Sequence, residues 1–214
     1  NKIPVLEFIN AQYSYTSNFE WQREGDAIQE VAGEDINTVQ NANTHNITAE
    51  LSMQRFYDYI GLTKRSGKTA ASKTPSKNSS TGKEPAKKGN ETSALFNVAV
   101  DVLTMLKRFN VNYSESNGTV LPGYLRSVGF IGTTKPTLGF VFGSQADVRF
   151  DAARKGWLTT FTDFNQQYIE VTNKQLNISA TAQPIQDLTI DLVADRNYAS
   201  NYQENFKVEE VVTD

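Results

Sequence analysis

Residues 10–21 read NAQYSYTSNFEW, and the kind of side chain in this stretch changes at every second position. The odd-numbered positions are mainly aromatic, and they are Ala11, Tyr13, Tyr15, Ser17, Phe19 and Trp21. The even-numbered positions are polar, and they are Asn10, Gln12, Ser14, Thr16, Asn18 and Glu20. Successive side chains of a β-strand point to opposite faces, so this period of two predicts a strand with one apolar and one polar face.

Four further segments repeat the pattern, at residues 46–53, 109–114, 175–182 and 187–195. Their apolar positions are Ile47, Ala49, Leu51, Met53, Phe109, Val111, Tyr113, Leu176, Ile178, Ala180, Ala182, Leu188, Ile190, Leu192 and Ala194. Val193 is an exception, because it is apolar at a position of the polar series. The sequence therefore predicts an all-β fold with minor helices, built on an antiparallel sheet of about five strands.

The composition indicates which class of β-protein this is. Only 38% of the 214 residues are hydrophobic, below the roughly 45–50% of ordinary globular proteins. Asn, Gln, Ser and Thr are abundant beside 2 Trp, 9 Tyr and 12 Phe, a mixture typical of outer-membrane barrels, whose strands alternate between lipid and water. The net charge of −3 predicts no nucleic-acid partner. The absence of cysteine argues against a small disulfide-bonded domain.

Two interpretations of the sheet compete. A soluble antiparallel sheet also has one wet side and one apolar side. The polar faces here are dominated by small amides and hydroxyls, as a water-filled lumen requires, and aromatic residues gather near the strand ends, as in an interfacial girdle. We therefore expect a transmembrane barrel wall in the outer membrane. Five strands cannot close a barrel, so further strands, in the same or another polypeptide, must pair with these in the lipid.

This interpretation assigns each strand residue to a face. We expect the lumen to be lined by Gln12, Ser14, Thr16, Asn18, Asn110, Asn112, Asn177, Ser179, Thr181, Asp187, Thr189 and Asp191. We expect the lipid bilayer to contact Tyr13, Tyr15, Phe19, Ile47, Leu51, Phe109, Val111, Leu176, Ile178, Leu188, Ile190 and Leu192.

The connections predict the order of segments along the chain. Residues 1–62 contain the first two strands, joined by an extracellular loop at 22–45. Residues 63–91 form a Lys/Ser-rich, low-complexity periplasmic insert, and residues 92–115 a helix followed by the third strand. Residues 116–173 form a long extracellular excursion with a short helix at 145–157 that begins after Ser144. Residues 174–214 form a hairpin, with its turn at Gln183-Pro184, and an outer extension.

The sequence offers little chemistry. His45 is the one histidine, so with no cysteine most nucleophilic triads and structural zinc sites are excluded. The segment Gly61…Ser66-Gly67-Lys68-Thr69 has five residues before its Gly-Lys pair, where a phosphate-binding loop needs four. Asp187, Asp191 and Asp195 share one strand face, where we expect them to hydrate a pore or pair with Arg196. The sequence predicts no enzyme, cofactor or metal.

Several segments together resemble a known family. They are residues 138–145 (LGFVFGSQ), 156–159 (GWLT), 165–168 (NQQY), 184–188 (PIQDL) and 196–202 (RNYASNY), with the Asn-rich residues 39–44 and the Lys/Ser-rich insert. In order and composition they are similar to the SprA/Sov family of Bacteroidetes, across most of the chain. The similar segments are not catalytic signatures.

The resemblance implies a function. SprA-like proteins form the outer-membrane translocon of the type IX secretion system, which also supports gliding motility. They are very large single-chain barrels that pass folded cargo to the cell surface, and their partners are a PorV-like shuttle protein and a plug protein. A chain of this family would contribute about five strands to the wall. The 116–173 excursion would lie at the extracellular mouth, where it would either cap the pore or contact cargo.

Two other functions remain open from the sequence. A porin-like or TonB-dependent channel for small solutes would use the same two-faced strands and would favour a narrow, charged lumen. A soluble cell-surface β-sandwich that binds glycan or protein would bury its apolar faces against each other and fold alone in buffer.

Overall fold

The computed structural model describes residues 7–62, 100, 104–129, 132–185 and 187–209. The predicted low-complexity insert at 63–91 lies outside these residues, and so does most of the helix predicted to precede the third strand.

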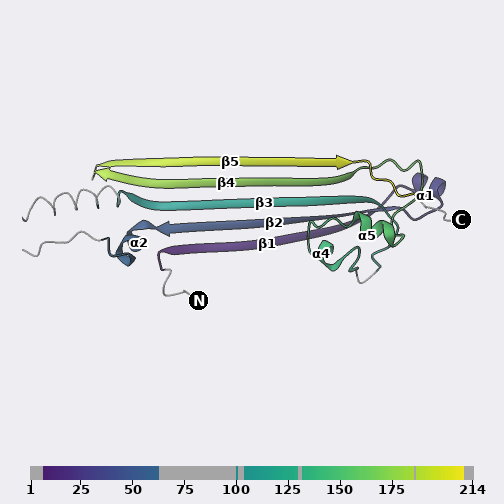
Figure 1. Cartoon of the computed structure of the whole chain (residues 1–214), viewed down its shortest axis with the longest axis horizontal. Coiled ribbons are helices and arrows are strands. Elements are labelled where there is room, and N and C mark those ends of the chain that lie inside the picture. Colours follow the sequence, from purple (N-terminus) through teal and green to yellow (C-terminus); the bar gives the residue numbers. More distant parts are fainter. Residues whose placement is uncertain (1–6, 63–99, 101–103, 130–131, 186, 210–214) are drawn as a thin grey trace, which may run out of the picture. The chain divides into compact units, whose positions relative to one another are not determined.

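Five long strands form one sheet, in the order β1-β2-β3-β4-β5 (Figure 1). They are β1 (Ile9–Arg23), β2 (Asn37–Ser52), β3 (Leu106–Tyr124), β4 (Tyr168–Ile185) and β5 (Leu188–Glu204). Each strand therefore lies beside its neighbours in sequence. This confirms the prediction of a mostly β fold built on five antiparallel strands, and the sheet is not closed.

Side-chain hydrogen bonds reveal the register between β2 and β3. The Thr44 hydroxyl lies 3.1 Å from that of Ser116, and the Ser114 hydroxyl donates to the Asn46 amide oxygen at 2.8 Å. A step of two residues forward in β2 thus matches a step of two residues back in β3, as an antiparallel pair requires. The alternation of faces read from the sequence is preserved across this pair.

All five strands are longer than their periodic segments, at 15 to 19 residues. In β2 the added residues lie at the start of the strand, which begins at Asn37 although the sequence predicted a loop up to residue 45. The pattern fails there because Asn41 and Asn43 are polar yet buried on the face that is otherwise apolar. Likewise β3 continues to Tyr124 and β4 begins at Tyr168, so the excursion occupies only residues 125–167.

The hairpin turn lies further along the chain than expected. Gln183 and Pro184 belong to β4, and the turn falls between Ile185 and Leu188. The Gln183 amide still donates to the Met105 carbonyl at 2.6 Å, which keeps the chain paired at that position. Proline is tolerated near a strand end because its missing donor is not needed there. Asp187 consequently lies in the turn, and its assignment to a lumen-facing strand position is corrected.

Within the described residues, four short helices have defined bounds. They are α1 (Asp26–Ala32), α2 (Met53–Tyr59), α4 (Leu138–Val141) and α5 (Arg149–Arg154). The helix predicted over 145–157 is shortened to α5, because Ser144 caps no helix and its hydroxyl accepts from the Ala146 amide at 3.3 Å. The preceding α4 was not predicted, and it begins where the Thr137 hydroxyl accepts from the Phe140 amide at 3.0 Å.

The chain divides into two compact units. The first unit comprises residues 1–10, 50–110 and 179–193, and the second comprises residues 11–49, 111–178 and 194–214. The buried apolar cluster belongs to the second unit and consists of Val39, Leu121, Tyr124, Phe140, Val148, Ala152, Leu158 and Tyr168. The main core therefore joins β2, β3 and β4 to the excursion.

The register of β4 and β5 can be tested by a disulfide, because the protein has no cysteine of its own. The Thr181 hydroxyl donates to an Asp191 carboxylate oxygen at 2.9 Å, so these residues face each other. We expect the Thr181→Cys/Asp191→Cys protein to cross-link under mild oxidation, because directly opposed Cβ atoms lie about 4.5–5.5 Å apart. The Thr181→Cys/Ile190→Cys control should not, because Ile190 points to the other face. A turn at Gln183-Pro184 would instead leave the first pair unlinked on a non-reducing gel.

Candidate functional site

The polar face of the first unit is held together by bonds between neighbouring strands. The Asn110 amide donates to the Ser179 hydroxyl at 3.3 Å, and Arg108 lies 3.6 Å from a Glu50 carboxylate oxygen. Uncharged amides and hydroxyls thus share this face with a solvent-exposed ion pair. Such a pair stabilises a fold by about 0–1 kcal/mol, so the face is water-compatible rather than a strong packing surface.

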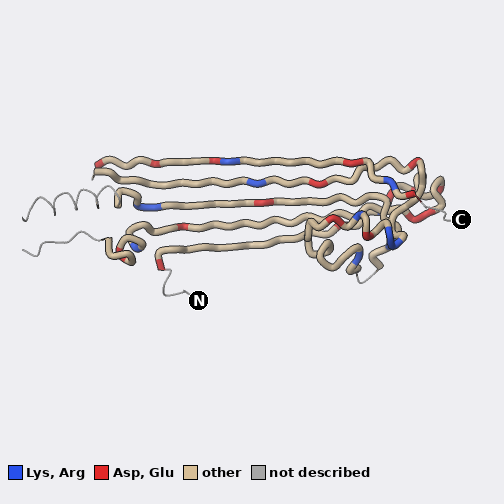
Figure 2. The backbone as a smooth tube through the Cα atoms, viewed as in Figure 1, with Lys and Arg blue, Asp and Glu red and all other residues tan. Residues whose placement is uncertain are grey.

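The polar face of the second unit is also held by side-chain hydrogen bonds between neighbouring strands. The Gln40 amide donates to the Glu20 carboxylate at 2.7 Å, in addition to the two β2–β3 hydrogen bonds described above. Charged positions are few along the strands, as Figure 2 shows. This arrangement hydrates a surface without a strong charge of either sign.

The structure brings four of the predicted lumen residues into these cross-strand bonds, namely Asn110, Ser179, Thr181 and Asp191. The other strand residues of that set lie in their predicted strands and form no such bond with any residue that the structure describes, and they are Gln12, Ser14, Thr16, Asn18, Asn112, Asn177 and Thr189. The face assignments are consistent with the alternation of the strands, and contact with a lumen stays a prediction.

The opposite face carries large apolar side chains that no described residue covers fully. Its most exposed aliphatic side chains are Leu192 at 56%, Leu188 at 45%, Ile190 at 41% and Ile47 at 41%. Five further members of the predicted lipid-facing set are partly buried in β2, β3 and β4, and they are Leu51, Phe109, Val111, Leu176 and Ile178. Burying one such side chain is worth about 1.5–3 kcal/mol, so this face favours an apolar environment.

Aromatic residues form the boundary of that apolar face in the second unit. The Tyr13 hydroxyl lies 2.8 Å from Nδ1 of His45, and the Tyr15 ring centroid lies 4.8 Å from that of His45. Tyr13, Tyr15 and Tyr198 are largely exposed. Tyrosine rings with one apolar and one polar end suit a membrane–water boundary. His45 is thus a hydrogen-bonded member of an aromatic cluster.

The excursion is docked on this same face by amide side chains. The Asn41 amide donates to the carbonyls of Phe140 and Ser144 at 2.8 and 2.9 Å, and the Asn43 amide donates to the Gly143 carbonyl at 2.6 Å. Both asparagines are buried, so these bonds satisfy groups that water cannot reach. The Asn-rich entry to β2 is therefore a docking strip for the loop after α4.

A second layer of polar contacts completes the docking. The Gln145 amide donates to the Asn41 side-chain oxygen at 3.0 Å, and the Thr119 hydroxyl donates to the Gln145 side-chain oxygen at 2.7 Å. The Tyr15 hydroxyl donates to the Phe142 carbonyl at 2.6 Å. Strands β1, β2 and β3 thus each hold residues 140–145 by at least one side chain.

Gly143 makes this close approach possible. Its φ angle is 88°, and an added Cβ would lie 2.8 Å from the Tyr15 hydroxyl and 2.9 Å from Cβ of Ser17. Any larger residue would meet the sheet and would also strain the backbone. The glycine therefore lets the loop lie directly on β1 and β2.

Phe19 departs from its predicted role. Its ring packs edge-on against Phe140, with centroids 6.2 Å apart, and it is partly buried against the apolar cluster. The expectation of a lipid-facing ring is therefore corrected, because the excursion covers this end of the apolar-series face. The excursion lies on the sheet face opposite to the polar one, and its position at the mouth of a pore stays a prediction.

Arg149 ties α5 to the ends of β4 and β5. Its guanidinium makes two bonds to the Asp147 carboxylate, at 3.1 and 2.9 Å, and also pairs with Glu204. The guanidinium carbon lies 4.0 Å from the Tyr168 ring centroid. The Arg149 hydrogen bonds hold the pKa of Asp147 below its ordinary value, although partial burial opposes this shift. The cluster is a structural clamp, since each charge has a partner.

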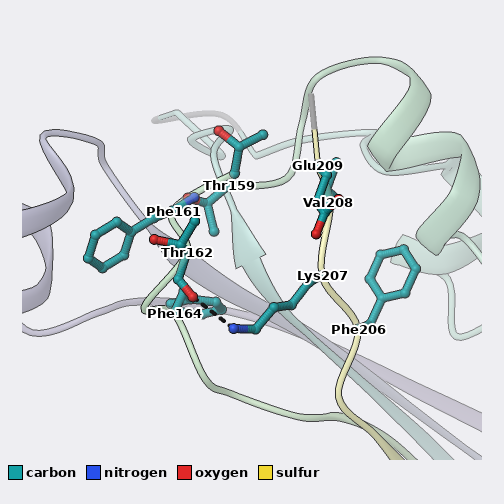
Figure 3. Close-up of a pocket in the computed structure, with 9 residues that line it drawn as sticks. Thr159, Phe161, Thr162, Phe164, Phe206, Lys207, Val208 and Glu209 are labelled. Carbon is teal, nitrogen blue, oxygen red and sulfur yellow. Dashed lines mark hydrogen bonds between the residues drawn. The ribbon is translucent and has the colours of Figure 1, made fainter. Parts of the chain in front are cut away.

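An open cavity of about 480 Å³ lies beside the second unit's core (Figure 3). It is bordered by residues 159–164 and by the extended segment 206–209, and Phe161, Phe164 and Phe206 supply aromatic rings. The Lys207 ammonium donates to the Thr162 carbonyl at 2.7 Å and links the two borders. The Lys207 ammonium is thus already engaged by the protein.

In the part of the chain that the structure describes, no group of three His, Asp or Glu residues could hold a metal ion. None of the described helices has the length and apolar character needed to cross a bilayer. No protein-family model matches the chain, and no curated protein sequence matches it.

Sequence reasoning missed the residues that dock the excursion. Asn41, Asn43 and Gln145 were visible only as polar residues. The two asparagines bind backbone carbonyls about 100 positions away, and Gln145 binds the side chain of Asn41. The Asn-rich stretch at 39–44 was a usable signal, since amides at apolar-series positions of a strand require partners. Arg149 gave no such signal, because its partner Glu204 lies 55 positions away.

Substitution of Gly143 should release the excursion from the sheet. We expect Gly143→Ala to weaken docking by about 1–3 kcal/mol, because the new methyl group overlaps Tyr15 and Ser17. Hydrogen exchange of residues 138–146 should therefore become faster. Gly156→Ala is the matched control, since Gly156 also has a positive φ angle but no atom within 4 Å of the added Cβ. Equal exchange in the two variants would contradict the close approach.

Acid should loosen the Arg149 clamp. The pKa of Asp147 is lower in the folded protein than the unfolded value of about 3.9. Its ionised form therefore stabilises the fold fully above the unfolded pKa. This stabilisation is lost as the pH falls through the folded-state pKa. We expect the urea midpoint of the excursion, followed by Trp157 fluorescence in a Trp21→Phe background, to fall at acidic pH. Asp147→Asn should flatten that dependence, and Asp163→Asn, at an exposed position, should not. An unchanged profile in Asp147→Asn would refute the clamp.

Proposed function

We propose that this chain forms part of the wall of an outer-membrane channel that exports folded proteins to the cell surface. The observation that carries the proposal is the two-faced sheet. One face presents amides and hydroxyls that bond across strands, and the other exposes Leu188, Ile190 and Leu192. Such alternation is what a wall between lipid and a wet lumen requires.

The strand lengths support a membrane position. A bilayer core of about 30 Å is crossed by roughly 9–11 tilted strand residues. The strands here have 15 to 19 residues, so each can cross the bilayer and continue beyond it. The excursion, docked by Asn41 and Asn43, would belong to the part beyond the bilayer.

The two edge strands support a larger assembly. The described sheet ends at β1 on one side and at β5 on the other, and these two strands do not pair with each other. In lipid, an unpaired strand edge costs several kcal/mol for each unsatisfied backbone group. Both edges therefore call for further strands, which the remainder of a larger barrel would supply.

The soluble sandwich explains the same pattern less well. It needs a second layer that buries the apolar face, and within the described residues the five strands form one sheet. The excursion covers the Phe19 end of that face and leaves Leu188, Ile190 and Leu192 exposed. A lipid bilayer provides the missing cover.

The nature of the cargo follows from the resemblance to the SprA/Sov family. That resemblance supports type IX secretion and gliding motility, with secreted proteins as cargo and with a PorV-like shuttle protein and a plug protein as partners. The few charges on the polar face suit passage of varied protein surfaces. A solute channel would favour a narrow, charged lumen instead, so the protein-conducting function is the one we propose.

Single cysteines at adjacent positions test this proposal, because the chain has none. We expect a fluorophore on Ile190→Cys to be quenched by lipids that carry a quencher in the acyl chain. The same fluorophore on Thr189→Cys should escape that quencher and respond to an aqueous one, because neighbouring strand residues face opposite sides. Equal quenching at both positions, in the intact protein reconstituted in vesicles, would contradict a membrane wall.

A cross-linker on the polar face tests the cargo. In secreting cells, a photoreactive probe at Asn112 should capture exported protein, whereas the same probe at Val111 should capture lipid. Capture of exported protein from neither position would leave a solute channel as the better explanation.

A further inference from the structure

A second cavity lies on the apolar-series face of β3, β4 and β5. It belongs to the second unit and has a volume of about 550 Å³. Its walls include two tyrosines, Tyr113 and Tyr198, two cations, Lys174 and Arg196, and the apolar side chain of Leu176. No feature of the barrel wall requires cations on this face.

The cavity lies where the character of the face changes. In β4 the face passes from Ile178 and Leu176 to Lys174, and in β5 it passes from Ala194 to Arg196. The change from aliphatic to cationic side chains thus occurs in two neighbouring strands at once. At the boundary of a bilayer, such a row meets the level of the lipid headgroups.

The two cations differ in their partners. The Lys174 ammonium lies 3.2 Å from a Glu115 carboxylate oxygen, which also accepts a hydrogen bond from the Tyr113 hydroxyl. Arg196 forms no ion pair or hydrogen bond with any residue that the structure describes, and the predicted pairing with the aspartates of β5 is not found there. Lys174, Arg196 and Glu115 together carry a net charge of +1, and the guanidinium donors of Arg196 are available.

We propose that this cavity binds the phosphate of an anionic lipid headgroup. Arg196 supplies the paired N–H donors that match a phosphate, and a guanidinium binds phosphate in this bidentate manner. The exposed Tyr198 hydroxyl adds a donor at the same level, and Leu176 contacts the beginning of the acyl chain. The proposal rests on the proposed membrane function and adds a chemical preference for the lipid beside β4 and β5.

Lipid titration of the intact protein tests the site. Nanodiscs of phosphatidylcholine would receive increasing phosphatidylglycerol, and retained lipid would be counted by native mass spectrometry. We expect Arg196→Gln to weaken phosphatidylglycerol retention about tenfold, because it removes a bidentate charge-assisted contact. Arg196→Lys should weaken it less, since it keeps the charge. Arg108→Gln is the matched control, because Arg108 is an exposed arginine of the polar face that pairs with Glu50.

Three results would overturn the site. They are equal retention by wild type and Arg196→Gln, an equal loss in Arg108→Gln, and suppression of lipid retention by millimolar inorganic phosphate, which would identify a general anion site. The Ile190→Cys quenching experiment, repeated in the same nanodiscs, separates this failure from that of the proposed function. Quenching without a preference for phosphatidylglycerol refutes the anionic-lipid site alone, whereas no quenching refutes the membrane wall.

Discussion

The backbone ladder of the five strands is the constraint on which the rest of the structure depends. Each strand pairs with its neighbours in sequence, so no crossover connection is needed. Once the ladder is antiparallel and unbroken, a period of two in the sequence becomes two faces in space. The bonds from Asn110 to Ser179 and from Thr181 to Asp191 are consequences of that register.

The sequence predicted those parts of the fold that depend only on whether each strand residue is polar or apolar. The alternation at 10–21 and at 175–182 located β1 and β4 because one face is apolar and the other is not. The same reasoning failed at residues 37–45, where Asn41 and Asn43 occupy apolar-series positions. These amides are buried because they bind carbonyls of the excursion, a long-range contact that no local pattern contains.

The candidate site divides in the same way. Face assignments such as Ile190 against Thr189 follow from the strand pattern and were available from the sequence. The cavity between Lys174 and Arg196 was not, because it depends on which residues of β4 and β5 become neighbours. The clamp at Arg149 depends in addition on the position of Glu204, which lies 55 residues later in the sequence. The alternation of polar and apolar residues could be read from the sequence. The partners of each side chain could not, because they depend on the register between neighbouring strands.

The position of the docked excursion has a consequence for how such a protein can change over time. Residues 138–158 attach to the side of the sheet that carries Tyr15 and Asn43, away from the amide- and hydroxyl-lined side. The excursion therefore lies outside the lumen of the proposed channel. Insertions in this segment would enlarge the outer surface without narrowing the lumen of the proposed channel. The length of the excursion and the diameter of the lumen can therefore evolve separately.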